Sequence, residues 1–411
     1  MAEINTGDTA WVLVAAALVM LMTPGLGFFY AGLVRRKNVL ATIMHSFFIL
    51  CLISVQWVLF GYSLAFGPSM GGIIGSLDWV GLNGVTLQPN ADYAGTIPHQ
   101  LFMAFQMMFA IITPALITGA FAERKRFKAF AIFSVLWATL VYAPVAHWVW
   151  GGTGQPGWLK ALGALDFAGG TVVHITAGMS ALVAAMVIGK RLGSDDGIEP
   201  HDATMTILGA ALLWFGWFGF NAGSALVAGP LAVSAFVNTN TAAAMAALTW
   251  MTVGWLHKGV PSPLGAAIGA VAGLVAITPA AGFVTPIASI LIGFGAGALC
   301  YGAVQLKSAF GVDDALDVWA CHGVGGVWGA FATGLFATKS VNELGNDGLF
   351  YGNPALLMNQ IIAIVVVSVF SIVMTWVILK IIDATIGLRV GEDEERRGLD
   401  ETQHGELAYQ I

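Results

Sequence analysis

Apolar segments recur along the whole chain and are separated by short polar stretches. A helix of about 20 apolar residues spans the hydrocarbon core of a bilayer, and only helices and closed barrels satisfy their backbone polar groups there. Eleven such segments fall at about 9–34, 40–66, 98–122, 128–150, 167–189, 203–228, 236–257, 263–278, 286–305, 317–337 and 355–382. The sequence therefore predicts an all-α polytopic membrane protein with eleven transmembrane helices.

Composition narrows the functional classes. Charged residues make up 10% of the chain, whereas about 25% of a soluble domain is charged. The three cysteines lie in apolar segments, so we predict neither a disulfide framework nor a cysteine metal site. No basic patch supports nucleic-acid binding. The residues before Trp11 lack the basic start and cleavage site of a signal peptide, so we predict that the first segment is retained.

The basic residues predict the orientation of the chain in the membrane. With the N-terminus outside, fifteen of them face inward and two outward, as the positive-inside rule requires. The inward set is Arg35, Arg36, Lys37, Arg124, Lys125, Arg126, Lys128, Lys190, Arg191, Lys258, Lys307, Lys380, Arg389, Arg396 and Arg397, and the outward pair is Lys160 and Lys339. We predict N-terminus out and C-terminus in, with a transmembrane domain at 1–388.

Residues 389–411 then form a cytoplasmic C-terminal tail. Its polar composition is typical of a solvated, mobile segment, although 392–397 could begin a helix. The loop at 190–202 is predicted to be a short polar turn on the same side. On the outer side, the loop at 67–97 is rich in Gly, Pro and Asn and could be an ordered cap or a tolerant loop.

The second half of the chain repeats features of the first. The sequence FYAG at 29–32 recurs as FNAG at 220–223, and both His174 and His322 follow an aspartate by eight residues. Because five segments separate the two units, the second unit runs in the opposite direction across the membrane. This predicts a five-plus-five inverted repeat, in which the substrate pathway lies at the repeat interface near the midplane.

His174 and His322 lie in segments that are otherwise uncharged, where ionisable side chains are rare and functional. Each could be a core histidine bonded to nearby backbone, but their equivalent positions favour a pair. In a pair, one ring N–H donates to the other ring, which fixes both tautomers. With Asp166 they could instead ligate a metal. We find no further ligand at matching depth, so neither a metal nor a cofactor is predicted.

Two kinds of side chain gather at the predicted outer ends. Asp166 could cap a helix by accepting backbone N–H groups, and the same charge could attract a cation. Aromatic rings could form an interfacial belt or a cage for a small cation, which a ring face attracts by ~0.5–2 kcal/mol. The aromatic residues concerned are Phe105, Phe109, Trp148, Trp150, Trp214, Trp217 and Phe220.

Four sequence motifs carry a specific resemblance. They are AHWVWGG at 146–152, GALDFAGGTVVH at 163–174, WFGFNAGS at 217–224 and DVWACHG at 317–323. The chain resembles the Amt/Mep/Rh ammonium transporters, and specifically the prokaryotic Amt branch. The resemblance extends from the first apolar segment into the tail, which keeps GLD at 398–400 and HGELAY at 404–409.

The resemblance implies three groups of residues along one path. An outer recruitment site for ammonium would be formed by Trp150, Phe105, Phe109 and Ser224 with Asp166 as the supporting acid, a gate by Phe109 and Phe220, and a pore lining by His174, His322 and Trp217. It further implies a multi-pass protein of the cell (inner) membrane. That protein would be a homotrimer with one pore per subunit, bind a cytoplasmic PII signalling protein, accept methylammonium as an analogue, and have no enzymatic activity.

Two other classes of protein were considered. A membrane-embedded receptor would be expected to carry an appended signalling domain, and the sequence contains none. An intramembrane metalloenzyme would need a fuller set of ligands. A transporter is therefore favoured, although the same protein could also act as a sensor. A narrow apolar pore would favour neutral ammonia over any bare cation. Deprotonation would then separate ammonium from potassium, which has no proton to lose.

Overall fold

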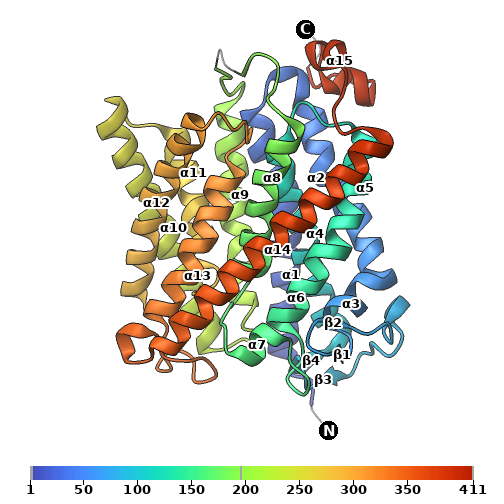
Figure 1. The fold of residues 1–411 in the computed structure, drawn as a ribbon. Coiled ribbons are helices and arrows are strands. Elements are labelled where there is room, and N and C mark those ends of the chain that lie inside the picture. Colours follow the sequence, from blue (N-terminus) through green and yellow to red (C-terminus); the bar gives the residue numbers. More distant parts are fainter. Residues whose placement is uncertain (1–2, 195–196, 410–411) are drawn as a thin grey trace.

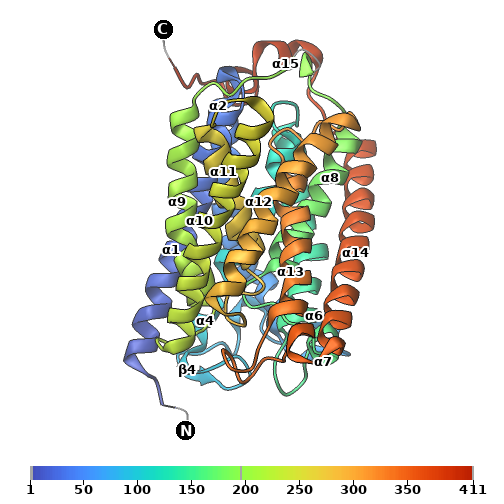
Figure 2. The ribbon, with the colours of Figure 1, turned by 90° about the vertical axis from the view of Figure 1, so that its left-hand side faces the viewer.

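Long helices run side by side along one axis, and the two ends of the described chain lie at opposite ends of this bundle (Figures 1 and 2). The computed structural model describes residues 3–194 and 197–409. Its α-helices are α1 (Thr6–Leu33), α2 (Val39–Gln56), α3 (Tyr62–Phe66), α4 (His99–Ile117), α5 (Phe127–Trp137), α6 (Ala143–Trp150), α7 (Trp158–Leu162), α8 (Thr176–Ile188), α9 (Ala203–Gly223), α10 (Pro230–Lys258), α11 (Pro263–Ile277), α12 (Pro286–Ala309), α13 (Gly325–Phe336), α14 (Pro354–Ile386) and α15 (Glu392–Arg397). Its strands are β1 (Ser69–Met70), β2 (Ile74–Gly75), β3 (Pro89–Asn90) and β4 (Ala94–Pro98).

Each of the eleven predicted segments contains a helix. In the described part of the chain, nine helices are long and apolar enough to cross a membrane when adjoining π and 3₁₀ turns are counted as continuations. The other two segments hold the 15-residue α11, and α13 together with the π turn Trp319–Val324 that precedes it. Helix length and composition thus support nine spans directly.

The predicted boundary between the sixth and seventh segments was wrong. Helix α9 ends at Gly223 with Ser224 as its C-cap, and Leu226 beyond it has a left-handed φ of 60°. Helix α10 begins at Pro230, which suits the first helical turn because its fixed φ fits and its missing N–H would be unpaired there anyway. As a result, Ser224 lies at a helix end instead of inside a span.

The predicted outer loop is an ordered cap. Strand β1 pairs with β2 and β3 with β4, and both hairpins lie at the end of the bundle that also holds the start of α1 (Figure 1). The Trp148 indole donates to the Ile73 carbonyl at 2.8 Å, and the Ser63 hydroxyl of α3 donates to the Ser76 carbonyl at 2.7 Å. These contacts anchor the cap to the helices.

The first helices of the two halves pack closely together. Helices α1 and α9 lie side by side (Figure 2), and glycines on α9 allow the approach. A Cβ at Gly209 would lie 2.2 Å from the Phe29 backbone nitrogen, and one at Gly219 would lie 2.7 Å from the Ala15 carbonyl oxygen. Small residues at such contacts are typical of membrane helix pairs, because they let two backbones meet.

The last helices of the two proposed repeats also meet, at the two histidines. His174 lies in the π turn Gly170–Ile175 that leads into α8, and His322 lies in the π turn that leads into α13. A Cβ at Gly178 would lie 2.0 Å from the Gly323 nitrogen. The same unusual backbone therefore holds a histidine in both halves.

Buried ion pairs close the other end of the bundle. Arg191 contacts Glu123 at 3.0 Å and Asp313 at 2.7 Å, and Arg35 contacts Glu123 at 3.1 Å. Burial alone would raise the pKa of Asp313, but its bonds to Arg191 hold that pKa at about 2. Arg35 also donates to the Leu192 carbonyl at 2.9 Å, so the predicted polar turn is tied to three other segments of the chain. Two of its residues, Asp195 and Asp196, lie outside the described residues, as do Gln410 and Ile411 of the tail.

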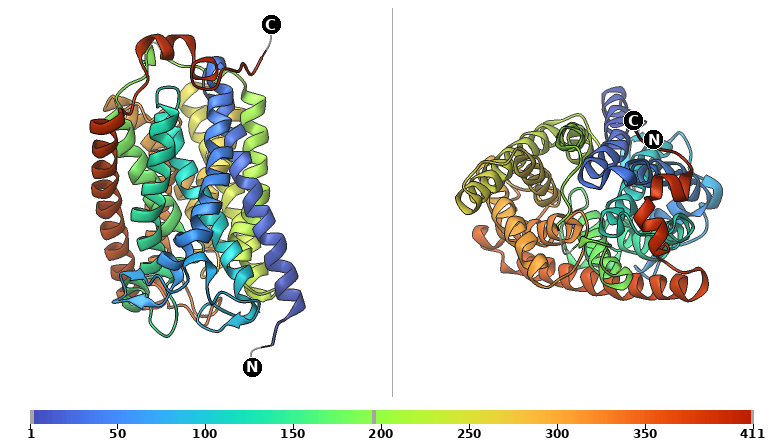
Figure 3. Two further views of the ribbon diagram at one scale, coloured as in Figure 1. Left: turned by 90° about the vertical axis from the view of Figure 1, so that its right-hand side faces the viewer. Right: turned by 90° about the horizontal axis from the view of Figure 1, so that it is seen from above.

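The tail is folded against the end of the bundle that holds the buried ion pairs. Of the two alternatives for it, a mobile segment or the start of a helix at 392–397, the structure shows the helix, α15. The carboxylate of Asp400 accepts hydrogen bonds from the backbone of Leu40 and Ala41 at 3.1 and 2.8 Å, and so caps the start of α2. Glu395 is 1% exposed and accepts from the Leu192 nitrogen at 2.6 Å. Figure 3 shows the tail lying across the end of the bundle on the side of α2 and α5.

Candidate functional site

Three cavities form a line through the bundle. We name these cavities by the predicted orientation of the chain. The cavity beside the β-hairpin cap, the outer cavity, has a volume of about 260 Å³. The middle cavity holds about 10 Å³, and the inner cavity, near the buried ion pairs, about 190 Å³. Phe29, Val271 and His322 line both the middle and the inner cavity. A space of 10–15 Å³ holds about one water molecule, so the middle cavity admits only a very small molecule.

The outer cavity contains all five predicted recruitment residues. Its lining includes Phe105, Phe109, Trp150, Asp166 and Ser224. The Phe109 ring meets Phe105 and Trp150 edge-on, with ring centroids 5.0 and 6.0 Å apart. The Ser224 hydroxyl donates to the Phe220 carbonyl at 2.8 Å, so its oxygen keeps lone pairs that can accept a hydrogen bond from a ligand.

Asp166 acts as a backbone cap in this structure. One carboxylate oxygen accepts from the nitrogens of Gly169 and Gly170 at 2.7 Å, and the other accepts from Thr171 at 2.8 Å and Val172 at 3.1 Å. Burial raises the pKa of Asp166, and these four N–H groups oppose that effect. The carboxylate thus caps the start of the helix that carries His174. The backbone carbonyl of Asp166 accepts a hydrogen bond from the Trp150 indole at 3.0 Å.

Two phenylalanine rings separate the outer cavity from the middle one. Phe109 lines the outer cavity and Phe220 the middle one. Their centroids lie 4.3 Å apart with the planes inclined by 40°, so the predicted pair is in contact but tilted, not parallel. Both side chains are buried, with exposed fractions of 1% and 0%.

The two histidines face one another below this pair of rings. The Nδ1 atoms of His174 and His322 lie 3.2 Å apart, so one ring donates a proton to the other. Because each neutral ring carries one N–H, the ring that accepts must carry its own proton on Nε2. Nε2 of His174 is buried without a partner among the described residues. Trp217 stacks on His174 at 5.4 Å and donates to the Thr278 hydroxyl at 2.9 Å.

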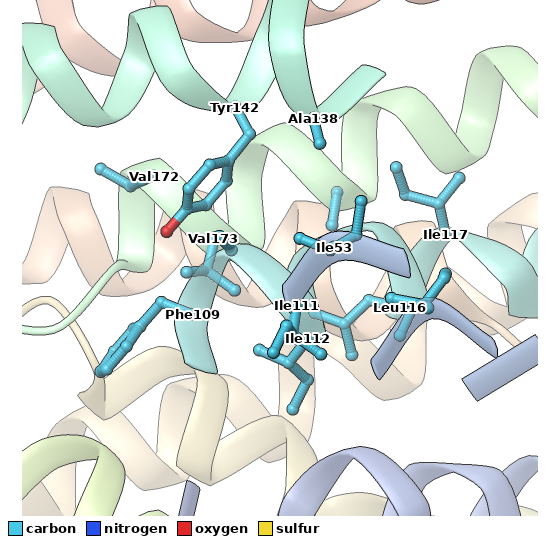
Figure 4. Close-up of a cluster of buried hydrophobic side chains, with 14 of the residues drawn as sticks. Ile53, Phe109, Ile111, Ile112, Leu116, Ile117, Ala138, Tyr142, Val172 and Val173 are labelled. Carbon is cyan, nitrogen blue, oxygen red and sulfur yellow. The ribbon is translucent and has the colours of Figure 1, made fainter. Parts of the chain in front are cut away.

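Three further residues of this region were missed by the sequence analysis. Gln106 lines the outer cavity, and its side-chain oxygen is buried without a partner among the described residues. Tyr142 is fully buried, and its hydroxyl, which has no partner in the described part of the chain, points toward Phe109 and the turn at Val172 (Figure 4). Lys160 lines the outer cavity as well. Of the three residues, only Gln106 had a signal in the sequence, since its amide lies between Phe105 and Phe109, two residues that were predicted to line the site.

The fold and the site define a class of protein. A multi-pass bundle of apolar helices encloses a nearly closed apolar passage that has a cavity at each end and polar groups only at a few points. Such an arrangement is suited to moving a small molecule across a membrane. Among the described residues, no group of three or more His, Cys, Asp or Glu could hold a metal ion.

Comparison with known proteins gives the family. Residues 10–409 match the model of the Ammonium Transporter Family. The chain is 58% identical to the ammonium transporter of Bacillus subtilis, over 98% of both chains. It is 50% identical to the ammonium transporter Amt1 of Archaeoglobus fulgidus, over 98% of this chain and 100% of the relative. The chain therefore belongs to the ammonium transporter family and is an integral multi-pass membrane protein.

Solved structures agree with this assignment. The crystal structure of Saccharomyces cerevisiae Mep2 matches with a TM-score of 0.91 and 38% identity, covering 99% of this chain and 92% of that one. A structure described as a Sensor Amt Protein matches with a TM-score of 0.90 and 32% identity, covering 97% and 98%. The resemblance inferred from the four motifs is thus confirmed.

Proposed function

We propose that this protein takes up ammonium by binding the cation in the outer cavity, removing its proton, and passing ammonia through the middle cavity. The observation that supports the proposal is the order of the cavities along the bundle. The outer cavity, lined by aromatic residues, leads to a space of about 10 Å³ lined by apolar residues and two histidines. The aromatic chamber suits a cation, and the narrow space suits a small neutral molecule.

Recruitment uses the groups that line the outer cavity. The Trp150 indole is held by its bond to the Asp166 carbonyl, and the rings of Phe105 and Phe109 complete an aromatic wall. Ring faces attract a cation by ~0.5–2 kcal/mol. The Ser224 oxygen accepts a hydrogen bond from the ligand. Potassium is attracted to the same ring faces and can be coordinated by the same hydroxyl oxygen, so this step concentrates monovalent cations without selecting ammonium.

Selection follows from the apolar passage. Moving a bare ion into an apolar interior costs on the order of 20 kcal/mol, against about 2–7 kcal/mol for a neutral polar group without a partner. Ammonium lowers this cost by losing its proton above the Phe109–Phe220 pair, and that proton either returns to the outer solution or crosses along the two histidines. Potassium has no proton to lose. Ammonia then meets the histidine pair, where the free Nε2 of His174 offers a hydrogen bond. The pair can also relay the proton.

The wider arrangement is proposed on several grounds. Eleven spans with the N-terminus out and the C-terminus in agree with the basic-residue bias, and the paired glycine contacts and π turns support the five-plus-five inverted repeat. A transmembrane domain at 1–388 with a cytoplasmic tail at 389–411 follows. Family membership supports a homotrimer in the cell (inner) membrane that has no enzymatic activity and that binds a PII protein through the tail.

Electrical recording on proteoliposomes tests the mechanism. Ammonium, methylammonium and potassium are applied in turn, with an uptake assay run in parallel. We expect saturable transport of ammonium and methylammonium and none of potassium. Potassium currents of the same size as ammonium currents would contradict selection by deprotonation.

A further inference from the structure

The outer cavity contains a charge of the wrong sign for a cation site. Lys160, on the short helix α7, lines the cavity, and its Nζ donates to the Gly151 carbonyl at 2.8 Å. A charge-assisted bond of this kind stabilises the ammonium form of the side chain. Burial lowers the pKa of Lys160, and the nearby carboxylate of Asp92 opposes that effect. A positive charge here repels any cation that enters.

The opposing charge is at the rim of the same cavity. Asp92 lines both the outer cavity and a second cavity of about 370 Å³ next to it. One oxygen of its carboxylate accepts from the Thr153 hydroxyl at 3.0 Å and from the Gly154 nitrogen at 3.1 Å. Its own backbone nitrogen donates to the Asn90 side chain at 3.0 Å. The carboxylate is therefore held in place although the residue is exposed.

Asp166, the other acid of the cavity, cannot take over this role fully. Its carboxylate already accepts four backbone N–H groups, whose dipoles offset its charge. The net field that an arriving cation meets is therefore set largely by Lys160 and Asp92, which carry opposite charges on different segments of the outer surface.

We propose that Lys160 and Asp92 form an opposed charge pair that sets the cation affinity of the outer cavity. This inference rests on the proposed role of that cavity in ammonium recruitment. A transport site must bind well enough to fill and weakly enough to empty. Lys160 weakens the binding of all cations and repels a divalent cation twice as strongly, so that the aromatic and Ser224 contacts hold monovalent cations in preference to divalent ones. The negative charge of Asp92 attracts cations to the cavity and so offsets the repulsion by Lys160.

A double-mutant cycle on full-length protein in proteoliposomes tests the pair. At the dielectric of an open cavity, one unit charge changes the binding constant by about two- to tenfold. We expect Lys160→Met to lower the KM for ammonium by about this factor and Asp92→Asn to raise it similarly. The double variant should return near the wild-type value, and Lys160→Arg should keep it. Mg²⁺ should inhibit Lys160→Met at lower concentrations than wild type.

Matched controls separate a local pair from the overall surface charge. Lys339→Met and Asp78→Asn make the same changes in net charge elsewhere on the predicted outer face and should leave KM unchanged. KM shifts of equal size in these controls, or KM shifts of the same sign in Lys160→Met and Asp92→Asn, would overturn the pair. Absence of saturable ammonium transport in the wild type would instead refute the proposed function of the cavity.

Discussion

The hydrogen bond between the two imidazole rings couples His174 and His322, so the two residues are best tested together. If they only fill space, replacing both with leucine should change stability slightly, because a satisfied hydrogen bond contributes only ~1 kcal/mol. If they relay protons, the double variant loses the groups that carry them. We expect ammonium-driven current to fall by on the order of 10²-fold, the lower end of what a positioned proton-transfer group contributes.

The measurement is current per correctly assembled protein in proteoliposomes, with the unfolding midpoint recorded alongside. Wild-type current and wild-type preference for ammonium over potassium in the double leucine variant would refute the relay.

The bonds of Asp166 predict that even a conservative change is costly. In Asp166→Asn, the side-chain NH₂ group cannot accept, so two of the four backbone N–H groups lose their partner. Each buried orphan costs about 1–3 kcal/mol, and we expect a lower unfolding midpoint together with weaker transport. Asp8→Asn is the control, because one Asp8 oxygen accepts from the Ala228 nitrogen and an asparagine oxygen can replace it. Equal midpoints for the two variants would show that the cap contributes little.

Gln106 provides a residue-scale test of recruitment. A buried amide oxygen without a protein partner is unfavourable for folding, so Gln106→Leu should leave stability unchanged or higher. If that amide binds ammonium, its loss should raise the KM by about tenfold, since a hydrogen bond to a charged group contributes about 1.5–3 kcal/mol. Met107→Leu, which alters a neighbouring side chain that is not part of the cavity lining, should leave KM unchanged. A wild-type KM for Gln106→Leu would exclude this contact.

Sequence reasoning located some of these residues and missed others for a physical reason. His174 and His322 were found because their shared spacing from an acid is a pattern in the chain itself, and the aromatic pair Phe109 and Phe220 was assigned through the family resemblance. Lys160 and Tyr142 were not found as site residues. Their relevance depends on the cavity beside Lys160 and on the packed core around the Tyr142 hydroxyl, and neither can be read from the sequence. That information depends on packing between distant segments.

At the scale of helices, hydropathy located every apolar segment but not its detailed geometry. The π turns at Gly170–Ile175 and Trp319–Val324 leave the apolar pattern unchanged, so composition gives no sign of them. Such turns often occur at functional sites. Helix α10 begins at Pro230, although the hydropathy pattern predicted a start at about 236. The pattern missed the first residues of this helix because their hydropathy is modest.

The tail gives a prediction at the same scale. Asp400→Ala removes the cap on α2, which is worth about 0.5–2 kcal/mol, and should release the tail. We expect faster hydrogen exchange in 392–404 and at the start of α2, with the pore intact. Glu406→Ala, at an exposed tail acid, is the control. Unchanged exchange in Asp400→Ala would show that other contacts hold the tail.

Deletion of 392–411 extends this test to regulation. If the tail binds PII as proposed, the truncated protein should keep its pore but bind PII more weakly or lose regulated uptake, because the segment docked against the end of the bundle that holds the buried ion pairs is missing. Equal PII affinity and equal uptake would show that the tail is dispensable for both.

At the scale of the whole molecule, the orientation of the bundle in the membrane decides which of its two ends faces outward. Residues from both halves meet at the histidine pair, and the long helix α14 crosses the bundle obliquely and packs on α13, α8 and α5 (Figure 1). The cap of β-hairpins lies at one end, and the ion pairs and the tail lie at the other. If the basic-residue bias sets orientation, the cap faces outward and the ion pairs inward.

Cysteine labelling tests this orientation. In a background that lacks Cys51, Cys300 and Cys321, a cysteine replaces either Ser340, which is exposed at the end of the bundle that holds the cap, or Ser194, near the buried ion pairs. With eleven spans and the N-terminus outside, an impermeant maleimide should label Ser340→Cys in intact cells and Ser194→Cys only after the membrane is opened. Labelling of both from the same side requires an even number of crossings between 194 and 340. That result would remove the odd span count on which the inverted repeat depends.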